Sequence, residues 1–361
     1  MKKQMHRNTR VFVKTVLCSL ILLSILFSTT ACFVPEDDEH YGISLFVDGD
    51  KAWKVLQFSD LHFGVEGSAY HNTDVARTLE FVDYAIKSQQ PDLIVLLGDN
   101  MMTQGVEGAR FIVETFDKYE TPYIFVFGNH DAELYDESLA KSDVSEYLDS
   151  CDSKYLLYKT GYVDTAENRY GNFSVSVRDR ENGELLGAFV ILDTGVYDYG
   201  KEMYQSINEG QIAWYEQEIE RLNGLYALQS NNALSTMPSI TYGHMQLPEY
   251  VDAYKKAKSG DGAEFVYYQD ISERRIDGLL SDTGEINYGF FDAMKRLQSS
   301  KAYLCGHMHG LNYHVKMDGI VLGFCPQAGV LGNKTNPITT FSYTVDRNFE
   351  ISLELVVEPI E

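Results

Sequence analysis

Five short apolar runs in this chain end in the same way, and that repetition constrains the fold more than any other feature. Each run is rich in β-branched, leucine or aromatic residues, which predicts a strand, and the second residue after each run is Asp, Asn or His. The runs and the polar residues that follow them are Trp53–Phe58 with Asp60 and His62, Leu93–Leu97 with Asp99, Tyr123–Phe127 with Asn129, His130 and Asp131, Ile240–Tyr242 with His244, and Ala302–Cys305 with His307 and His309. In four of the five cases a glycine stands between the run and the polar residue, which permits a tight turn. Because the carboxyl ends of strands form the ligand crevice of an open α/β sheet, the pattern predicts one polar site built from all five ends.

The residues between these strands predict the rest of the architecture. A helix is expected over Asp74–Lys87, with Thr73 as its cap, and another over Gly108–Tyr119. Alternating strands and helices indicate a parallel, buried sheet. Further elements are expected as a hairpin of strands at Asn172–Arg178 and Ala188–Leu192, as helices at Gln211–Leu222 and Phe290–Gln298, and as strands in the tail at Ile320–Phe324, Phe341–Val345 and Ile351–Val357. Together they predict an α/β (α+β) fold in which two sheets pack together with helices outside.

Two stretches show no clear periodicity. They are Thr160–Tyr170 and Ser259–Gly289. We interpret the second as a long loop near the site, where substrate contacts are common, with a disordered surface insertion as the alternative.

The residue types at the strand ends match one kind of chemistry. Carboxylate, imidazole and amide oxygen are ligands of divalent and trivalent cations. Asp60 and His62 alternate along the chain, as do His307 and His309, so both members of each pair can point into one crevice. The candidate ligands number seven, too many for one ion, and suit two ions that share a carboxylate: Asp60, His62, Asp99, Asn129, His244, His307 and His309. Any one of these motifs alone could be structural, but their joint appearance after successive strands favours a metal site.

The net charge of the chain indicates which classes of substrate and partner it can bind. The chain has 53 acidic and 30 basic residues, a formal net charge of −23. Non-specific nucleic-acid binding needs clustered Lys and Arg, so none is expected. An anionic substrate would need local positive charge, and bound cations are the obvious source. The alternative is that the charge only keeps the protein soluble.

The N-terminus has the form of an export signal. A basic segment from Lys2 to Lys14 precedes an apolar run, Val16–Phe27, that is short for a membrane span, and Ser28–Cys32 follows. A small residue before a cysteine at this place resembles a bacterial lipoprotein signal, which predicts a lipidated Cys32 and anchoring to the outer face of the cell membrane. Thr29 stands where such signals usually carry leucine, so ordinary secretion or a retained anchor remain open. We therefore expect a signal peptide at 1–32, a linker at 33–50 and one domain at 51–361.

The five strand-end motifs, taken in order, resemble those of the calcineurin-like metallophosphoesterases. The resemblance runs from about Trp53 to Phe324. Three further stretches look like the branch close to purple acid phosphatases: Ile191–Gly195, Gln211–Tyr215 and His244–Tyr250. The resemblance implies a two-sheet αββα sandwich, a dinuclear metal centre, and hydrolysis of a phosphorylated substrate by a metal-activated water.

The resemblance also assigns roles within the site. Asp60, His62 and His309 would hold one metal, Asn129, His244 and His307 the other, and Asp99 would bridge them. His130 would stabilise the transition state or protonate the leaving oxygen, and Asp131 would orient it. In purple acid phosphatases a tyrosinate lies three residues after the bridging aspartate, whereas Met102 stands there in this chain. We therefore expect Mn, Zn or ferrous Fe more readily than a stable ferric ion.

Two alternatives stay open. Within the same chemistry the enzyme could be a phosphodiesterase or nucleotidase rather than a monoesterase. A different class is a non-catalytic surface lipoprotein that binds a phosphorylated ligand. Outside the predicted site, His71 and His314 are interpreted as polar surface, and Cys305, Trp214 and Tyr215 as core.

Overall fold

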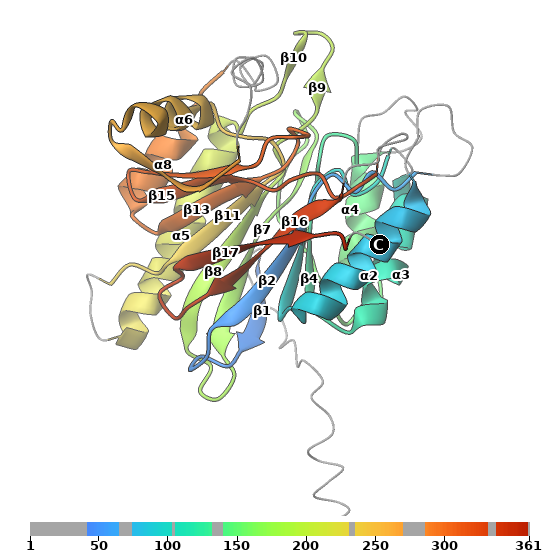
Figure 1. The fold of residues 1–361 in the computed structure, drawn as a ribbon. Helices are drawn as coiled ribbons and strands as arrows, with labels where there is room; N and C mark the ends of the chain where they lie inside the picture. The colour runs from blue at the N-terminus through green and yellow to red at the C-terminus, as the bar shows by residue number, and fades with distance from the viewer. Residues whose placement is uncertain are drawn as a thin grey trace, which may run out of the picture. The chain divides into compact units, whose positions relative to one another are not determined.

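A computed structural model describes residues 42–64, 74–102, 105–131, 140–230, 235–269, 286–330 and 337–359. The signal segment with Cys32, as well as Thr73 and His71, lie outside these residues. Two main sheets make up the described part, with a separate two-stranded hairpin (Figure 1).

The first sheet has six strands. Its order is β17-β16-β2-β3-β4-β5. The strands are β2 (Trp53–Phe58), β3 (Leu93–Leu97), β4 (Tyr123–Val126), β5 (Leu156–Leu157), β16 (Thr339–Val345) and β17 (Ile351–Val357). Strands β2 to β5 are parallel, and β16 and β17 add antiparallel neighbours at the β2 side. The helices of this half are α2 (Val75–Gln89), α3 (Gly105–Phe116), the short 3₁₀ helix η1 (Asp117–Tyr119) and α4 (Lys141–Ser150).

The second sheet has nine strands. Its order is β1-β7-β8-β11-β13-β15-β14-β12, and β6 pairs with β7. The strands are β1 (Gly42–Val47), β6 (Tyr162–Asp164), β7 (Arg169–Asp179), β8 (Leu185–Leu192), β11 (Ser239–Gly243), β12 (Ala263–Tyr268), β13 (Ser300–Cys305), β14 (Tyr313–Met317) and β15 (Ile320–Phe324). The remaining elements are the hairpin β9 (Tyr197–Asp198) and β10 (Met203–Tyr204) and the helices α5 (Glu209–Ser230), α6 (Glu249–Ser259) and α8 (Phe290–Leu297).

Strand β8 shows how the layers are held together. All eight of its residues are buried, and successive side chains enter two different cores. Phe189 and Ile191 face the core between the two sheets, which also takes in side chains of α2 and α3. Val190 and Leu192 face the core under α5, α6 and α8. The period-2 alternation of a strand thus produces an α–β–β–α layering, as predicted (Figure 1).

The register of the central strands sets the site. Phe58 of β2 lies beside Leu96 of β3, and Tyr242 of β11 lies beside Leu304 of β13. These parallel neighbours end almost level, so their polar followers emerge side by side. The two sheets meet at these ends, where Nδ1 of His244 lies 2.9 Å from the Leu97 carbonyl oxygen.

Several local expectations differ from the structure. Residues 42–47 are not linker but strand β1, which pairs in parallel with β7, so the domain begins before residue 51. Residues 263–268 are not loop but the edge strand β12, while 270–285 fall outside the described residues. Helix α2 is capped by Asp74, whose side chain accepts a hydrogen bond from the backbone N–H of Arg77. None of the helices within the described residues is both long and apolar enough to cross a bilayer.

Candidate metal centre

The structure brings the candidate ligands from both sheets to one place. Asp60 and His62 follow β2, Asp99 follows β3, Asn129, His130 and Asp131 follow β4, His244 follows β11, and His307 and His309 follow β13. Six of them form two groups of potential metal ligands, Asp60 with His62 and His309, and Asp99 with His244 and His307. Asn129 is fully buried after Gly128 in the same region.

In the first group three side chains converge on one point. Nε2 of His309 lies 3.1 Å from Oδ1 of Asp60 and 3.0 Å from Nε2 of His62. Two imidazole nitrogens and a carboxylate oxygen this close together can share a ring proton or bind one metal cation. Asp60 and His62 are buried, whereas about a third of the His309 side chain is exposed, which gives the group a solvent-facing side.

In the second group Asp99 faces His244. Nε2 of His244 lies 3.1 Å from Oδ2 of Asp99. Its Nδ1 is directed at the Leu97 carbonyl, which can only accept, so Nδ1 carries the proton. In the neutral ring, Nε2 therefore presents a lone pair to a carboxylate oxygen. That pair of acceptors is stable only with a proton or a metal ion between them, and so this donor set fits a metal.

The Asp99 carboxylate also lies near the first group of candidate metal ligands. Its Oδ2 lies 3.9 Å from Nε2 of His62. One carboxylate oxygen thus lies between the two groups, the arrangement expected of a shared ligand.

Backbone strain marks the same residues. Asp60, His62, Asp99 and His307 all have left-handed backbone, with φ of 55°, 48°, 50° and 66°. For residues other than glycine this conformation costs roughly 1–2 kcal/mol each. Hydrogen bonds between the loops hold it, from Asp60 N–H to the Gly98 carbonyl (3.0 Å) and from His62 N–H to the Asp99 carbonyl (2.8 Å). Strain of this kind is typical of functional sites.

Two glycines before the ligands are required by close approach. A Cβ at Gly98 would run into the His244 ring, and one at Gly128 would run into the backbone and carboxylate of Asp99. Gly98 thus lets strand ends of the two sheets approach one another, and Gly128 does so for two neighbouring strands of the first sheet.

The electrostatics reflect crowded and buried charges. Burial opposes ionisation of Asp60 and Asp99, but neighbouring histidines, His309 and His244 in turn, hold both carboxyl pKa values well below the usual range. Burial also opposes a charge on His244, but the Asp99 carboxylate outweighs it and raises the His244 pKa to about 10. Burial lowers the pKa of His62 to about 4. The Asp60 and Asp99 carboxylates and the His62 imidazole are thus in the forms that bind cations, whereas His244 holds a proton towards Asp99 that a metal ion would replace.

His130 and Asp131 flank the two groups. The His130 ring lies edge-on to that of His62, with centroids 5.3 Å apart, and its backbone N–H donates to Oδ1 of Asp99 at 2.8 Å. Asp131 accepts hydrogen bonds from the backbone N–H groups of Met101 and Gly128, both at 2.8 Å. Burial and the nearby Asp99 charge raise the pKa of Asp131 to about 7. Asp131 therefore ties together the loops after β3 and β4, a contact that sequence reasoning did not foresee.

Other contacts of the site were also missed. The Ser59 hydroxyl donates to Oδ2 of Asp60 at 2.6 Å, and its position next to Asp60 was the available signal. Sδ of Met102 lies 2.8 Å from Nδ1 of His62, so the methionine in the tyrosine position packs directly on a candidate ligand. No sequence signal links Tyr204 to the site, yet its ring packs edge-on against His307 with centroids 4.8 Å apart.

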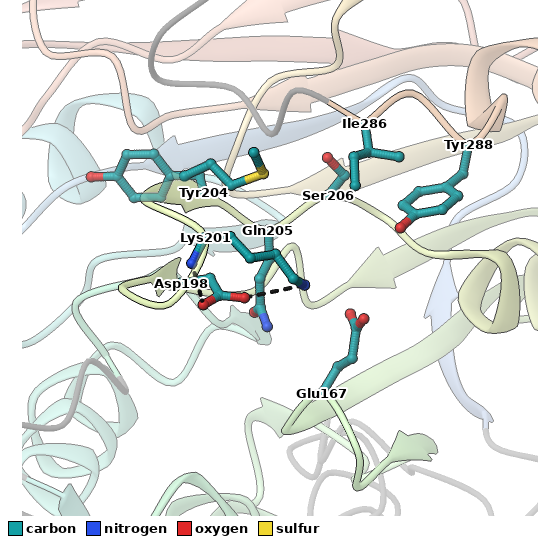
Figure 2. Close-up of a pocket in the computed structure, with 9 residues that line it drawn as sticks. Glu167, Asp198, Lys201, Tyr204, Gln205, Ser206, Ile286 and Tyr288 are labelled. Carbon is teal, nitrogen blue, oxygen red and sulfur yellow. Dashed lines mark hydrogen bonds and ion pairs between the residues drawn. The ribbon is translucent and has the colours of Figure 1, made fainter.

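A small cavity lies beside the hairpin that carries Tyr204 (Figure 2). Its volume is about 20 Å³, room for one or two water molecules. Glu167, Asp198 and Lys201 line it, and Lys201 Nζ pairs with Asp198 Oδ2 at 3.2 Å. The cavity is too small to hold an organic group.

The three additional sequence stretches meet behind the site. Gln211 donates through Nε2 to the Asp193 carbonyl at 2.7 Å, and the Met245 N–H donates to the Thr194 hydroxyl at 3.1 Å. Asp193 also forms a buried ion pair with Lys141, at 2.8 Å. These stretches therefore brace the ends of β8 and β11.

Outside the site, the predicted core residues are confirmed, whereas the predicted surface position of His314 is wrong. Trp214, Tyr215 and Cys305 are buried in the core under the helices, as predicted. His314 is not a surface residue: it is fully buried on β14, opposite Gly323 of β15. A Cβ at Gly323 would collide with the His314 ring, so the glycine makes room for the imidazole.

Comparison with known proteins relates this chain to phosphoesterases. The family model described as "Calcineurin-like phosphoesterase" matches residues 54–311. The "Probable inactive purple acid phosphatase 29" of Arabidopsis thaliana is 23% identical, with 83% of this chain and 78% of the relative covered. The "Probable inactive purple acid phosphatase 14" of the same plant is 24% identical, with 91% and 82% covered. Among solved structures, a dimetal phosphatase from Danio rerio has a TM-score of 0.46 and 9% identity, covering 85% of this chain and 99% of its own.

Proposed function

This chain belongs to the calcineurin-like phosphoesterases, and on that premise we propose that it is a phosphatase that hydrolyses phosphate esters at two metal ions. Asp60, His62 and His309 would hold one ion. The other would be held by Asn129, His244 and His307, and Asp99 would bridge the pair. The observation that carries this proposal is the position of the Asp99 carboxylate oxygen, 3.1 Å from His244 in one group and 3.9 Å from His62 in the other.

The metal ions would polarise the phosphate and supply a hydroxide nucleophile near neutral pH. Within the protein, His130 would donate a proton to the leaving oxygen or stabilise charge on the phosphoryl group. Its backbone bond to Asp99 fixes the start of its loop. Asp131 would position His130 through that same loop, because its carboxylate accepts a hydrogen bond from the backbone N–H of Gly128, two residues before His130.

The metals we propose are Mn, Zn or ferrous Fe. The donors are carboxylate, imidazole and amide, which suit all three. The Met102 thioether lies against His62 where the purple enzymes have a phenolate, so a hard ferric ion lacks its preferred ligand.

Hydrolysis of a chromogenic ester tests the proposal. Purified protein would be supplied with manganese and either 4-nitrophenyl phosphate or bis(4-nitrophenyl) phosphate, so that monoesterase and diesterase activity are read separately. Turnover that is lost on chelation and restored by manganese supports it. A protein that binds two metals and a phosphate ester but releases no nitrophenol would instead be a non-catalytic binder, the reading in keeping with the names of the two plant relatives.

We propose in addition that the protein is exported and held by lipid at Cys32 on the outer face of the cell membrane. The support is the sequence of residues 1–32, a basic segment and an apolar run that end at a small residue and a cysteine. A diacyl-type anchor on Cys32 would hold the domain stably, whereas a single chain binds weakly.

A further inference from the structure

A cavity of about 580 Å³ opens beside His309, between the loop after β13 and the strands β16 and β17. We name it the His309 cavity. Its wall includes His309 and Asn312, most of the segment 326–330, Ile338 directly before β16, and Leu355 and Val357 of β17. Its volume is in the range of small-molecule sites.

The His309 cavity is joined directly to the candidate metal centre. His309 belongs to the first ligand group and also forms part of the cavity wall. The segment 326–330 is hydrogen-bonded to the ligand loop after β2, since Ala328 N–H donates to the Ser59 carbonyl (2.9 Å) and Gly329 N–H to the Asp60 carbonyl (3.0 Å). A phosphate at the metals would therefore have its organic group within reach of this cavity.

The described part of the wall differs in composition from the rest of this acidic protein. The described residues that line the cavity include no Lys, Arg, Asp or Glu, although the chain has 53 acidic residues. Its described side chains are six aliphatic or proline residues together with the amides Gln269, Asn312 and Gln327, Thr339 and the His309 imidazole. Glu358, next to Val357, is directed elsewhere and accepts from Arg77 at 2.9 Å.

The residues of the cavity wall indicate which organic groups of a substrate can bind there. A second phosphate or a carboxylate would lose water there without gaining a cation, and an ammonium would gain no carboxylate. The described wall also has no Phe, Tyr or Trp on which a nucleobase could stack. An uncharged apolar group would gain from burial.

We propose that the natural substrate is a phosphate ester of an uncharged, predominantly apolar alcohol, and that this alcohol binds in the His309 cavity. The proposal rests on the phosphoesterase function proposed above and adds the substrate class. It favours such esters over nucleotides and over phosphorylated acids.

Three synthetic esters with nearly equal leaving-group acidity test the proposal. They are phenyl phosphate, 4-butylphenyl phosphate and 4-(3-carboxypropyl)phenyl phosphate, assayed with the manganese-loaded full chain. We expect kcat/KM to be at least about tenfold higher for the butyl ester than for phenyl phosphate, since burial of only two of its four added carbons would suffice at roughly fourfold each. The carboxypropyl ester should be no better than phenyl phosphate.

Substitutions in the wall of the His309 cavity provide a second test of the proposal. Val357→Asp should reduce the preference for the butyl ester over phenyl phosphate to about twofold or less. Val357→Lys should raise kcat/KM for the carboxypropyl ester relative to the parent, a gain that misfolding cannot produce. The matched control is Val266→Asp on β12, because Val266 is 43% exposed, Val357 is 40% exposed, and Val266 is not part of the wall.

The outcomes separate this inference from the proposed function. Equal kcat/KM for the phenyl and butyl esters, or a preference that Val357→Asp and Val266→Asp change equally, would overturn the apolar-alcohol assignment while the phosphoesterase stands. Hydrolysis of none of the esters, together with no turnover of 4-nitrophenyl phosphate or its diester, would overturn both.

Discussion

The Asp99 carboxylate faces Nε2 of His244 at 3.1 Å, while Nδ1 of that ring is directed at the Leu97 carbonyl. The same carboxylate oxygen lies 3.9 Å from His62 of the other ligand group. Removing this one carboxylate should therefore affect both metal positions.

We predict that Asp99→Asn releases both metals and abolishes ester hydrolysis. An amide is neutral and cannot bridge two cations as a carboxylate does. Elemental analysis of the purified variant gives the metal content, with Asp292→Asn, an exposed residue beside Lys295, as the control for a lost carboxylate. Two metals retained per chain in Asp99→Asn would show that Asp99 does not bridge.

His130→Ala should lower kcat by roughly 10²–10⁴ and leave the metal content nearly unchanged. The reason is that the His130 ring lies beside His62 without being one of the seven candidate ligands. Esters with poor leaving groups should suffer most, because they depend most on proton donation. Normal turnover of a poor leaving group by the variant would make His130 a structural residue.

The buried His314 should make the fold sensitive to acid. Burial alone lowers its pKa to about 3, and within the described residues neither ring nitrogen has a hydrogen-bond partner. Its ring neighbours are Tyr267 and Phe341, both uncharged at acidic pH. Below an unfolded pKa of about 6.5 the unfolded chain binds a proton that the folded chain does not, so the free energy of unfolding falls as pH falls from there towards 3.

Between pH 7.5 and pH 5 this one histidine should cost about 2 kcal/mol of unfolding free energy. His314→Phe keeps a flat ring beside Gly323 and removes the titration. Urea unfolding of both proteins at the two pH values isolates the effect, since all other groups are shared. Equal losses of stability in parent and variant would mean that His314 is protonated as easily in the folded protein as in the unfolded one.

The sequence predicted most of the centre because its determinants are local. A strand, a glycine and a polar residue are adjacent in the chain, and the parallel order of β2, β3 and β4 then aligns their ends. Contacts between residues that lie far apart in the sequence were not predictable in this way. Tyr204 reaches His307 from a hairpin about a hundred residues earlier, and no period or motif marks it.

Strand β12 and the burial of His314 were not predicted from the sequence, for a related reason. Strand β12 follows Gly260 and Gly262, which look like loop residues, and its pattern of half-buried and exposed side chains depends on pairing with β14 alone. His314 is polar, yet it is buried because its pairing partner is Gly323. The burial of a polar residue was set by a neighbour that becomes adjacent only in the folded sheet.

Cys32 should determine membrane retention. We expect the parent to sediment with membranes and Cys32→Ala to be released from them, because the run Val16–Phe27 is short for a membrane span. Cell fractionation followed by immunodetection gives the result, and Cys151→Ala serves as the matched control. Variant and parent fractionating alike would rule out a lipid anchor at Cys32.

The iron-loaded, oxidised protein should not be purple. A visible charge-transfer band in purple acid phosphatases requires tyrosinate bound to ferric iron, and the corresponding place here is held by Met102, whose sulfur lies 2.8 Å from Nδ1 of His62. A thioether is a soft, neutral and poor ligand for ferric iron, and the neighbouring imidazole stabilises the ferric state less than a phenolate does. The spectrum should therefore lack a strong band in the visible, while Met102→Tyr, which restores a phenol at this position, should gain one. Tyr204, packed on His307, is the described tyrosine best placed to contradict this expectation. A band in the parent that disappears in Tyr204→Phe would mean that a tyrosine of the hairpin binds the metal.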